Sequence, residues 1–216
     1  MIKAVILDFD GTVVDSESVN VAAAIQTFQE LGYPLSDAQK ERVLGKSSKD
    51  FIPVFLQELG LLPELFENLY QKNWKNYLAL WDTDMVKPMP FACEVIKALH
   101  DRGVVLSIAT SNHHVSVEKF ISRFGFHDTF RYILTGEDVV ERKPHPEIYI
   151  AMQEKLALPA GDIIAVEDTG HGLASAKDAG LRCAVVPTSF SRGHDFSRAD
   201  YILSSLQELP AIVFSQ

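Results

Sequence analysis

The sequence predicts an α/β fold: a doubly wound, Rossmann-like parallel sheet with a small all-helical cap domain inserted after its first strand. Two observations lead to this expectation. Short apolar runs alternate with amphipathic helical patterns from about residue 91 onward, as in proteins with a parallel sheet. Residues 16–84, in contrast, carry helical patterns only. We therefore expect a core domain of residues 1–15 and 85–216 and a cap domain of residues 16–84, with hinges at residues 14–17 and 82–90.

The expected strands are continuous apolar runs, a pattern that suits strands buried on both faces of a sheet. The first, residues 3–8, ends in an acid, Asp8. The same pattern recurs at residues 104–109, 163–166 and 183–186, with shorter candidates at 132–134 and 201–203. If these strands are parallel, their carboxyl ends meet at one edge of the sheet, where open α/β sheets bind ligands.

The expected helices are bounded by glycine, proline and capping residues. A glycine follows each of the patterns at residues 17–31, 49–59, 91–102 and 115–124, and a proline opens those that begin at residues 63 and 146. Ser36 with Gln39 resembles a capping box for one more helix. A stripe of apolar side chains at helical spacing is expected to form the core of the cap. It consists of Phe51, Val54, Phe55 and Leu59.

Composition excludes several classes of function. The 216 residues carry 20 Lys and Arg against 29 Asp and Glu, a net charge of -9, which argues against a nucleic-acid partner because phosphate backbones require a basic surface. No apolar run approaches the roughly 18 residues of a membrane span, so we expect no membrane partner and a cytoplasmic location. Cys93 and Cys183 are expected to be free, buried thiols in a reducing compartment. No broad exposed apolar stripe is evident, so a monomer is expected.

Polar side chains follow the apolar runs at four places in the chain. They are the segments Asp8–Thr12, Thr110–Asn112, Lys143-Pro144 and Glu167-Asp168. In a parallel sheet these segments converge at one edge and collect acids, a hydroxyl group, backbone amides and an ammonium group. Carboxylates that are packed together repel one another, and a divalent cation relieves that repulsion.

A site with only oxygen ligands suits Mg²⁺, which retains water molecules and accepts a substrate phosphate. Asp8, Asp168 and a backbone carbonyl group are the candidate ligands. Lys143 and Thr110 then supply the donors that a phosphoryl group requires, because phosphoryl transfer depends mainly on positioning and on stabilising charge. Two carboxylates that lie two residues apart, Asp8 and Asp10, can act separately as nucleophile and as acid/base.

These residues resemble the motifs of the haloacid dehalogenase-like superfamily, specifically its phosphatases and phosphomutases with a small helical cap. The motif Asp-x-Asp-Gly-Thr at residues 8–12 carries the resemblance, together with Lys143-Pro144 and Glu167-Asp168, and it covers essentially the whole chain. The resemblance implies a phosphatase that acts on a small phosphorylated metabolite, such as a sugar phosphate, with Mg²⁺ as cofactor. Asp10 disfavours dehalogenation, since the family members with that activity lack this second Asp.

The resemblance also implies how the acidic residues act. Asp8 would attack phosphorus and form an aspartyl-phosphate, and Asp10 would protonate the leaving alcohol and then activate water. Mg²⁺ would be held by Asp8, the backbone carbonyl of Asp10 and Asp168. Glu167 would lie beside the ion, either as a ligand or one layer further out.

Two groups of residues would bind the substrate. In the core, Thr110 and Lys143 would hold the phosphoryl oxygens, with further contacts from Gly11, Ser111 and Asn112. In the cap, a polar turn at residues 46–49 would supply local positive charge, which a negative protein needs to attract an anion. The candidate contacts there are Asn20, Lys46 and Lys49.

One position departs from the family pattern. Many family phosphatases have a further Asp four residues after the position of Asp168, and this chain has Gly172 there. Which of Glu167 and Asp168 touches the ion directly therefore stays open. Among nearby histidines, His113 and His114 are adjacent and do not share a helix face, so they are expected at a helix start rather than at a metal. His171 is expected in a loop.

Three alternatives compete with the phosphatase. β-Phosphoglucomutase shares the four motifs, but the mutases have a His in the first cap helix where this chain has Asn20, and an Arg where it has Ser48 or Lys49. A mutase must protect its phospho-aspartate from water until the sugar has reoriented. The His couples closure of the cap to Asp10, so its loss favours hydrolysis. A signalling receiver domain and a non-catalytic binding descendant of the family are the alternatives that are not enzymes.

Overall fold

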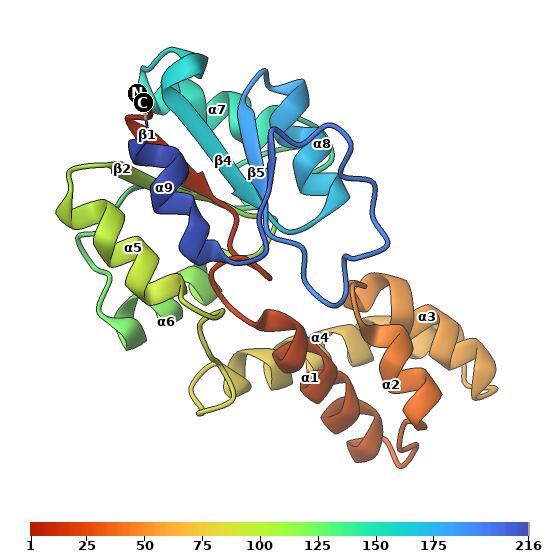
Figure 1. The fold of residues 1–216 in the computed structure, drawn as a ribbon. Helices are drawn as coiled ribbons and strands as arrows, with labels where there is room; N and C mark the ends of the chain where they lie inside the picture. The colour runs from red at the N-terminus through yellow and green to blue at the C-terminus, as the bar shows by residue number, and fades with distance from the viewer. Residues whose placement is uncertain (216) are drawn as a thin grey trace. The chain divides into compact units, whose positions relative to one another are not determined.

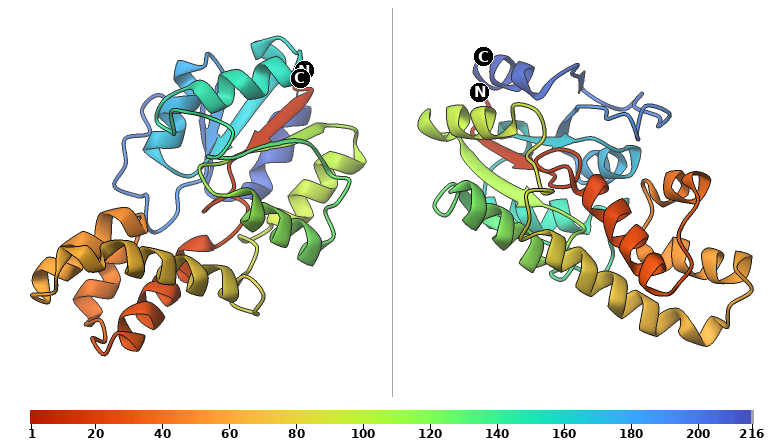
Figure 2. Two further views of the ribbon diagram at one scale, coloured as in Figure 1. Left: turned by 180° about the vertical axis from the view of Figure 1, so that it is seen from behind. Right: turned by 90° about the horizontal axis from the view of Figure 1, so that it is seen from below.

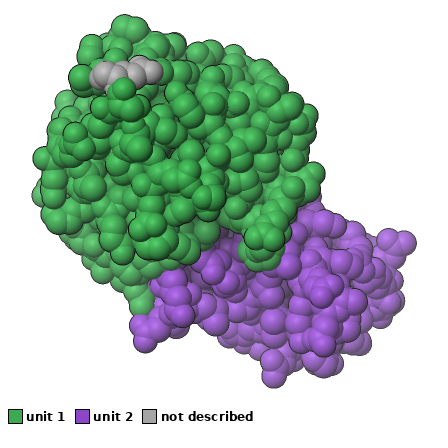
Figure 3. Space-filling model, viewed as in Figure 1, with its two compact units in different colours: residues 1–14, 88–216 green, residues 15–87 purple. Residues whose placement is uncertain are grey.

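The computed structural model describes residues 1–215, which form two compact units (Figures 1 and 3). The larger unit comprises Met1–Val14 and Pro88–Gln216, and the smaller comprises Asp15–Lys87. The chain thus enters the smaller unit soon after its first strand and returns to the larger one at residue 88. Within residues 1–215 we find no helix with the length and apolar character needed to cross a membrane.

A six-stranded sheet forms the centre of the larger unit. Its strands are β1 (Ala4–Leu7), β2 (Val105–Ala109), β3 (Phe130–Leu134), β4 (Ile163–Glu167), β5 (Arg182–Val185) and β6 (Tyr201–Ile202). They lie in the order β3-β2-β1-β4-β5-β6, and every neighbouring pair is parallel. β1 is central, with Leu7 aligned to Ile108 of β2 and to Val166 of β4. The predicted parallel α/β sheet is confirmed.

Helices cover both faces of this sheet (Figures 1 and 2). They are α5 (Ala92–Asp101), α6 (His114–Phe124), α7 (Glu147–Leu156), α8 (Gly170–Asp178) and α9 (Leu209–Phe214), with short 3₁₀ turns η2 (Ala160–Asp162) and η3 (Leu206–Glu208). α5 packs against α9 and α7 packs against α8, and the two pairs lie on opposite faces. Every residue of β1 and β4 is therefore buried, which explains their continuous apolar runs. Cys183 of β5 and Cys93 of α5 are both free, but Cys93 is only half-buried.

The strand order determines where polar side chains can gather. From β1 the chain proceeds to β2 and β3 on one side, and then crosses to β4, β5 and β6 on the other. The strand order therefore reverses between β1 and β4, and open α/β sheets bind ligands at the carboxyl ends of strands at such a point. Asp8 follows β1 and Asp168 follows β4, so the fold places both at this point.

The smaller unit contains only helices. They are α1 (Ser16–Glu30), α2 (Asp37–Val43), α3 (Ser48–Glu58) and α4 (Phe66–Leu80), with a 3₁₀ turn η1 (Pro63–Leu65). The predicted capping box of α2 is confirmed: Ser36 accepts from the Gln39 N–H and donates its own N–H to the Gln39 side chain. Phe51 and Phe55 lie in the core as predicted. Val54 does not, because it lies on another side of α3 and is 38% exposed.

The two segments expected as hinges pair with one another. Val14 forms an antiparallel bridge with Pro88. Beside it, the Asp15 N–H donates to the Lys87 carbonyl at 2.9 Å. Because this pairing ties the outgoing and returning segments together, a rotation in one has to be shared by the other. That they act as hinges stays a prediction.

Local sequence patterns misplaced some boundaries. α8 begins at Gly170, so His171 lies in its first turn and not in a loop. Because two residues of that turn are glycines, the sequence pattern did not place the start of the helix there. The side chain of Thr169 caps the helix. Lys49 lies in the first turn of α3 rather than in a turn between helices. α9 has only six residues, too few to show helical periodicity.

Candidate functional site

Loops at the carboxyl ends of three adjacent strands carry most of the candidate residues. Asp8 continues β1, and its N–H donates to a carbonyl of β4 at 2.9 Å. Thr110 continues β2, and its N–H donates to a carbonyl of β3 at 3.0 Å. Glu167 ends β4, and Asp168 follows directly. The sheet's own hydrogen bonds therefore fix the backbone from which these side chains project.

Lys143 is buried and links these loops. Its Nζ lies 2.6 Å from Asp8 Oδ1, 2.6 Å from Glu167 Oε1 and 2.8 Å from the Ala109 carbonyl oxygen. An ammonium group has three hydrogens, so these three close acceptors are enough to use all of its donors. Burial lowers the pKa of Lys143, but Asp8 and Glu167 outweigh that effect and raise the pKa above its ordinary value. Lys143 is therefore charged at neutral pH.

Tyr149 belongs to the same cluster, although sequence reasoning did not select it. Its hydroxyl donates to Glu167 Oε1 at 2.5 Å and lies 3.4 Å from Lys143 Nζ. Its ring centroid lies 4.9 Å from the same Nζ. Tyr149 is in the first turn of α7, where the pattern showed only an apolar helix face. Nothing in that pattern separates a buried tyrosine with a polar task from an ordinary core residue.

Asp10 is held by the loop after β2. Thr110 Oγ1 donates to Asp10 Oδ2 at 3.0 Å, and Asn112 Nδ2 donates to Asp10 Oδ1 at 2.7 Å. The Asn112 N–H in turn donates to Thr110 Oγ1 at 3.0 Å. Ser111, which separates these two residues in the chain, is half-buried. The two side chains expected to bind phosphate therefore orient the second carboxylate of the motif in this structure.

Asp8, Glu167 and Asp168 form a buried acidic cluster. One carboxylate oxygen of each lies within 4.8 Å of the others. Burial, followed by repulsion from Asp8 and Glu167, raises the pKa of Asp168 to about 9. Burial and the Glu167 charge also raise the pKa of Asp8 well above its ordinary value. Lys143 is the single cation bonded to this cluster within residues 1–215, so the three carboxyl groups outnumber the ammonium group, and the oxygen-only donor set fits a hard divalent cation.

Gly11 lets the cluster come together at the end of β1. Its φ of +76° lies in the left-handed region, which favours glycine. A Cβ atom at this position would collide with the Asp168 carboxylate. A side chain at residue 11 would therefore both strain the turn and displace a carboxylate of the candidate metal site.

The fold and these residues match a known family. The family described as haloacid dehalogenase-like hydrolase matches residues 5–186, a range that includes all of the loops above. The chain belongs to this family. The resemblance inferred from the motifs is confirmed, and the interpretation as a receiver domain is set aside.

Relatives of this haloacid dehalogenase-like hydrolase cover nearly its whole length. Protein CbbY of Rhodobacter capsulatus is 30% identical over 95% of this chain and 94% of its own. Pyrophosphatase PpaX of Halalkalibacterium halodurans is 30% identical over 98% and 97%. CbbY from Rhodobacter sphaeroides, solved with phosphate, has a TM-score of 0.82 at 30% identity over 97% and 96%; a mutant of it was solved with xylulose-1,5-bisphosphate. This chain is a haloacid dehalogenase-like hydrolase of the capped, β-phosphoglucomutase-like branch.

Gly172 marks the departure of this hydrolase from the motif of many family phosphatases. A Cβ atom at residue 172 would collide with the carboxylate group of Glu167. A side chain at 172 and the Glu167 carboxylate therefore exclude one another. Glu167 reaches the cluster from β4 through the space that Gly172 leaves, which gives a physical reason for the pairing of Glu at 167 with Gly at 172.

We expect Gly172→Ala to weaken binding of Mg²⁺, used as the probe, by about 10–100-fold. The added methyl group pushes the Glu167 carboxylate away from Lys143 and from the acidic cluster. Isothermal titration with Mg²⁺ measures the effect. Gly161→Ala is the matched control, because a Cβ atom at residue 161 meets no described atom within 4 Å. Equal Mg²⁺ affinity in the two variants would contradict this account of the site.

The raised pKa of Asp168 predicts that cation binding depends on pH. The pKa of Asp168 is about 9 in the folded protein, against an ordinary value of 3.8. The contribution of Asp168 to the stability of the fold is therefore full below pH 3.8 and is lost as the pH rises through about 9. A bound cation displaces the retained proton. The Mg²⁺-induced rise in Tm should therefore grow from about pH 6 to about pH 9. Thermal unfolding with and without Mg²⁺ measures this, and a shift that does not change with pH, or one equally steep in Asp168→Asn, would contradict it.

Three of the candidate residues, Asn20, Lys46 and Lys49, belong to the smaller unit. Asn20 Nδ2 donates to the Lys46 carbonyl at 3.0 Å, which joins α1 to the segment before α3. The side chain of Lys46 is exposed. Lys49 Nζ lies 5.6 Å from the ring centroid of Tyr70 on α4. The structure therefore brings Asn20 and Lys46 together and places Lys49 over an aromatic ring.

The adjacent histidines open α6, and each has an acidic partner. His113 Nδ1 lies 2.7 Å from Glu137 Oε1, and His114 Nε2 lies 2.8 Å from Asp138 Oδ2. These contacts hold the loop after β3 against the start of α6. His113 is the N-cap residue of α6 and His114 is its first residue, so the prediction that the pair belongs to a helix start is confirmed. That neither histidine binds a metal stays a prediction.

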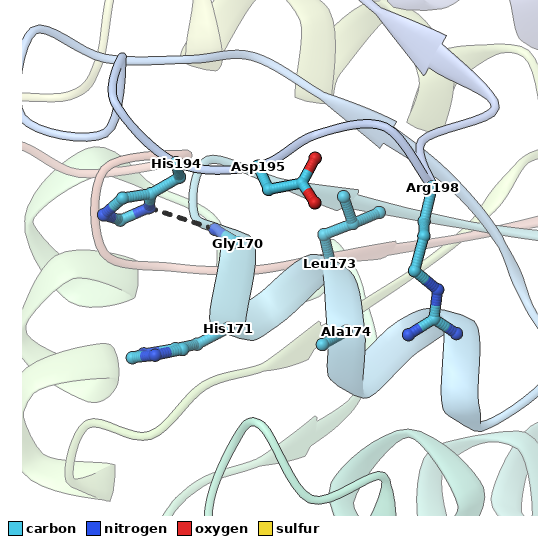
Figure 4. A pocket seen from close by; sticks show the side chains of 7 residues that line it. All are labelled: Gly170, His171, Leu173, Ala174, His194, Asp195 and Arg198. Atoms are coloured by element: carbon cyan, nitrogen blue, oxygen red, sulfur yellow. Dashed lines mark hydrogen bonds between the residues drawn. The ribbon is translucent and has the colours of Figure 1, made fainter.

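A pocket of about 330 Å³ lies beside α8 (Figure 4). It is lined by Gly170, His171, Leu173, Ala174, His194, Asp195 and Arg198. His194 Nδ1 accepts from the Gly170 N–H at 3.1 Å. The rings of His171 and His194 are stacked, with their centroids 6.4 Å apart. At the other end, Arg198 is paired with Asp178 at 2.6 Å. His194 thus fastens the segment after β5 to the start of α8, and none of the sequence-predicted site residues lines this pocket.

Proposed function

We propose that this hydrolase is a Mg²⁺-dependent phosphatase that dephosphorylates a small metabolite, such as a sugar phosphate, through an aspartyl-phosphate on Asp8. The observation that carries the proposal is the different setting of two carboxylates on one loop. Asp8 is buried against Lys143, whereas Asp10 is held by neutral donors, Thr110 and Asn112. Carboxylates in unlike environments take unlike roles, one as nucleophile and one as acid/base.

In the first step, Asp8 attacks phosphorus while the bond from phosphorus to the leaving oxygen breaks. Asp10 gives its proton to that oxygen, which departs as an alcohol. Lys143 and Thr110 donate to the phosphoryl oxygens, assisted by the backbone N–H groups of Gly11 and Ser111. When bound, Mg²⁺ supplies positive charge that offsets the carboxylates and the phosphoryl oxygens. The groups that would hold it are the Asp10 carbonyl, Asp8, Asp168 and Glu167.

In the second step, water replaces the alcohol. Asp10, now a carboxylate, takes a proton from the water as the water oxygen attacks phosphorus. The bond between phosphorus and Asp8 breaks, which returns Asp8 as a carboxylate and releases inorganic phosphate. Asp10 holds a proton again, so the residues are ready for the next substrate.

Asn20 supports hydrolysis over transfer to a sugar hydroxyl. The mutases have a His at this position, which can exchange a proton near neutral pH. Asn20 has no such proton, and its amide is bonded to the Lys46 carbonyl. β-Phosphoglucomutase activity is the alternative. A sugar phosphate as substrate is supported by the relative solved with xylulose-1,5-bisphosphate, and we assign its recognition to the exposed cations Lys46 and Lys49.

The test is incubation of the protein with Mg²⁺ and a panel of phosphorylated sugars, polyols and nucleotides. Free phosphate and sugar isomers are measured in the same samples, with a metal-free sample as the control. Phosphate release that requires Mg²⁺, without an isomer, is expected. An isomer without phosphate would instead establish the mutase, and no turnover of any compound would contradict both activities.

A further inference from the structure

The hydrogen bonds of Lys143 leave no donor for a phosphoryl oxygen. Its Nζ lies within 2.8 Å of Asp8, Glu167 and the Ala109 carbonyl and 3.4 Å from the Tyr149 hydroxyl, so its three hydrogens already have more acceptors than they can fill. The proposed function, on which this inference rests, requires Lys143 to hold the phosphoryl group. Lys143 must therefore give up one of its three close partners when a phosphate enters.

Glu167 is the carboxylate that can be released at the smallest cost. Of the two carboxylates bonded to Lys143, Glu167 alone has a second donor within residues 1–215, the Tyr149 hydroxyl at 2.5 Å. A buried carboxylate oxygen that loses its last hydrogen bond is strongly destabilised. Because Tyr149 donates to the same oxygen, Oε1, that oxygen stays bonded after Lys143 has turned away.

We propose that Tyr149 is a positioning residue: its hydroxyl holds Glu167 so that Lys143 can turn from Glu167 to a phosphoryl oxygen. The ring is well placed for this task, since it is fully buried and packs with Ile148 and Met152 in the core beside the sheet. A hydroxyl on a fixed ring does not follow the ammonium when the ammonium moves. The ring face also stays near Lys143 Nζ, at 4.9 Å from the centroid, and favours its positive charge.

Tyr149→Phe tests the proposal because it keeps the ring and removes only the hydroxyl. In this variant Glu167 Oε1 lacks the hydroxyl that would stay bonded to it after Lys143 has turned away. With Mg²⁺ at saturation, we expect the Kd of inorganic phosphate to rise about tenfold by isothermal titration. The KM of a phosphomonoester substrate should rise by a similar factor. An unchanged Kd for phosphate would overturn the proposal, even if the Tm fell, because a purely structural role lowers stability alone.

Tyr132→Phe is the matched control. Tyr132 packs against the same apolar cluster, and its hydroxyl has no hydrogen bond to Lys143 or Glu167 among the described residues. A rise in Kd of the same size in both variants would overturn the proposal.

The phosphate titration also separates this inference from the proposed function. A protein that binds phosphate but releases none from any monoester disproves the phosphatase, and its titration still decides the role of Tyr149; a protein that binds no phosphate overturns both.

Discussion

Asp8→Asn is expected to abolish turnover, lowering kcat on the order of 10⁵-fold. An amide oxygen is a far weaker nucleophile than a carboxylate, so no bond to phosphorus forms. The substitution nearly preserves shape, and the Asn carbonyl can still accept from Lys143 in place of Asp8 Oδ1. The loss should therefore occur without loss of the fold. Phosphate release under saturating substrate measures the activity, and thermal unfolding measures the fold.

Asp195→Asn is the matched control for this prediction. Asp195 is an exposed carboxylate in the same unit, and its Oδ1 accepts from the backbone N–H of Ser197. Its substitution should leave kcat within about twofold of the native value. If Asp8→Asn retained activity within about tenfold of the native protein, Asp8 would not be the nucleophile.

Lys143→Met is expected to have the largest effect on stability, about 3 kcal/mol in the protein without added metal. Methionine fills a similar space, but it leaves Asp8 and Glu167 buried without their cation. Breaking a buried ion pair from one side costs more than the pair itself contributes, because the remaining charge is uncompensated. Urea unfolding measures the free energy difference. Added Mg²⁺ should recover part of it, since it supplies positive charge to the same carboxylates.

Lys97→Met is the control for stability. Lys97 pairs with Asp101 one turn along α5, and its side chain is 73% exposed. Such exposed pairs contribute little, so a change below about 0.5 kcal/mol is expected. Equal destabilisation by the two substitutions would show that burial of the Lys143 cluster does not govern its energetics.

The sequence by itself determined the architecture and the meeting place of the candidate residues. Strands buried on both faces must be apolar throughout, so β1 and β4 could be recognised without knowledge of their neighbours. Parallel strands present their carboxyl ends at one edge. Asp8, Lys143 and Asp168 could therefore be predicted to gather there from their positions after apolar runs, although they are far apart in the chain.

Only the tertiary structure decided how these residues divide their contacts. The hydroxyl of Tyr149 bonds to Glu167 on a different element, and Glu167 occupies the place that a side chain at Gly172 would need. Periodicity reports which face of a helix is buried, but not which polar atom that face meets. Side-chain contacts across strands and helices depend on packing distances of a few ångströms. Those distances are set by all of the elements together, and no local pattern in the chain contains them.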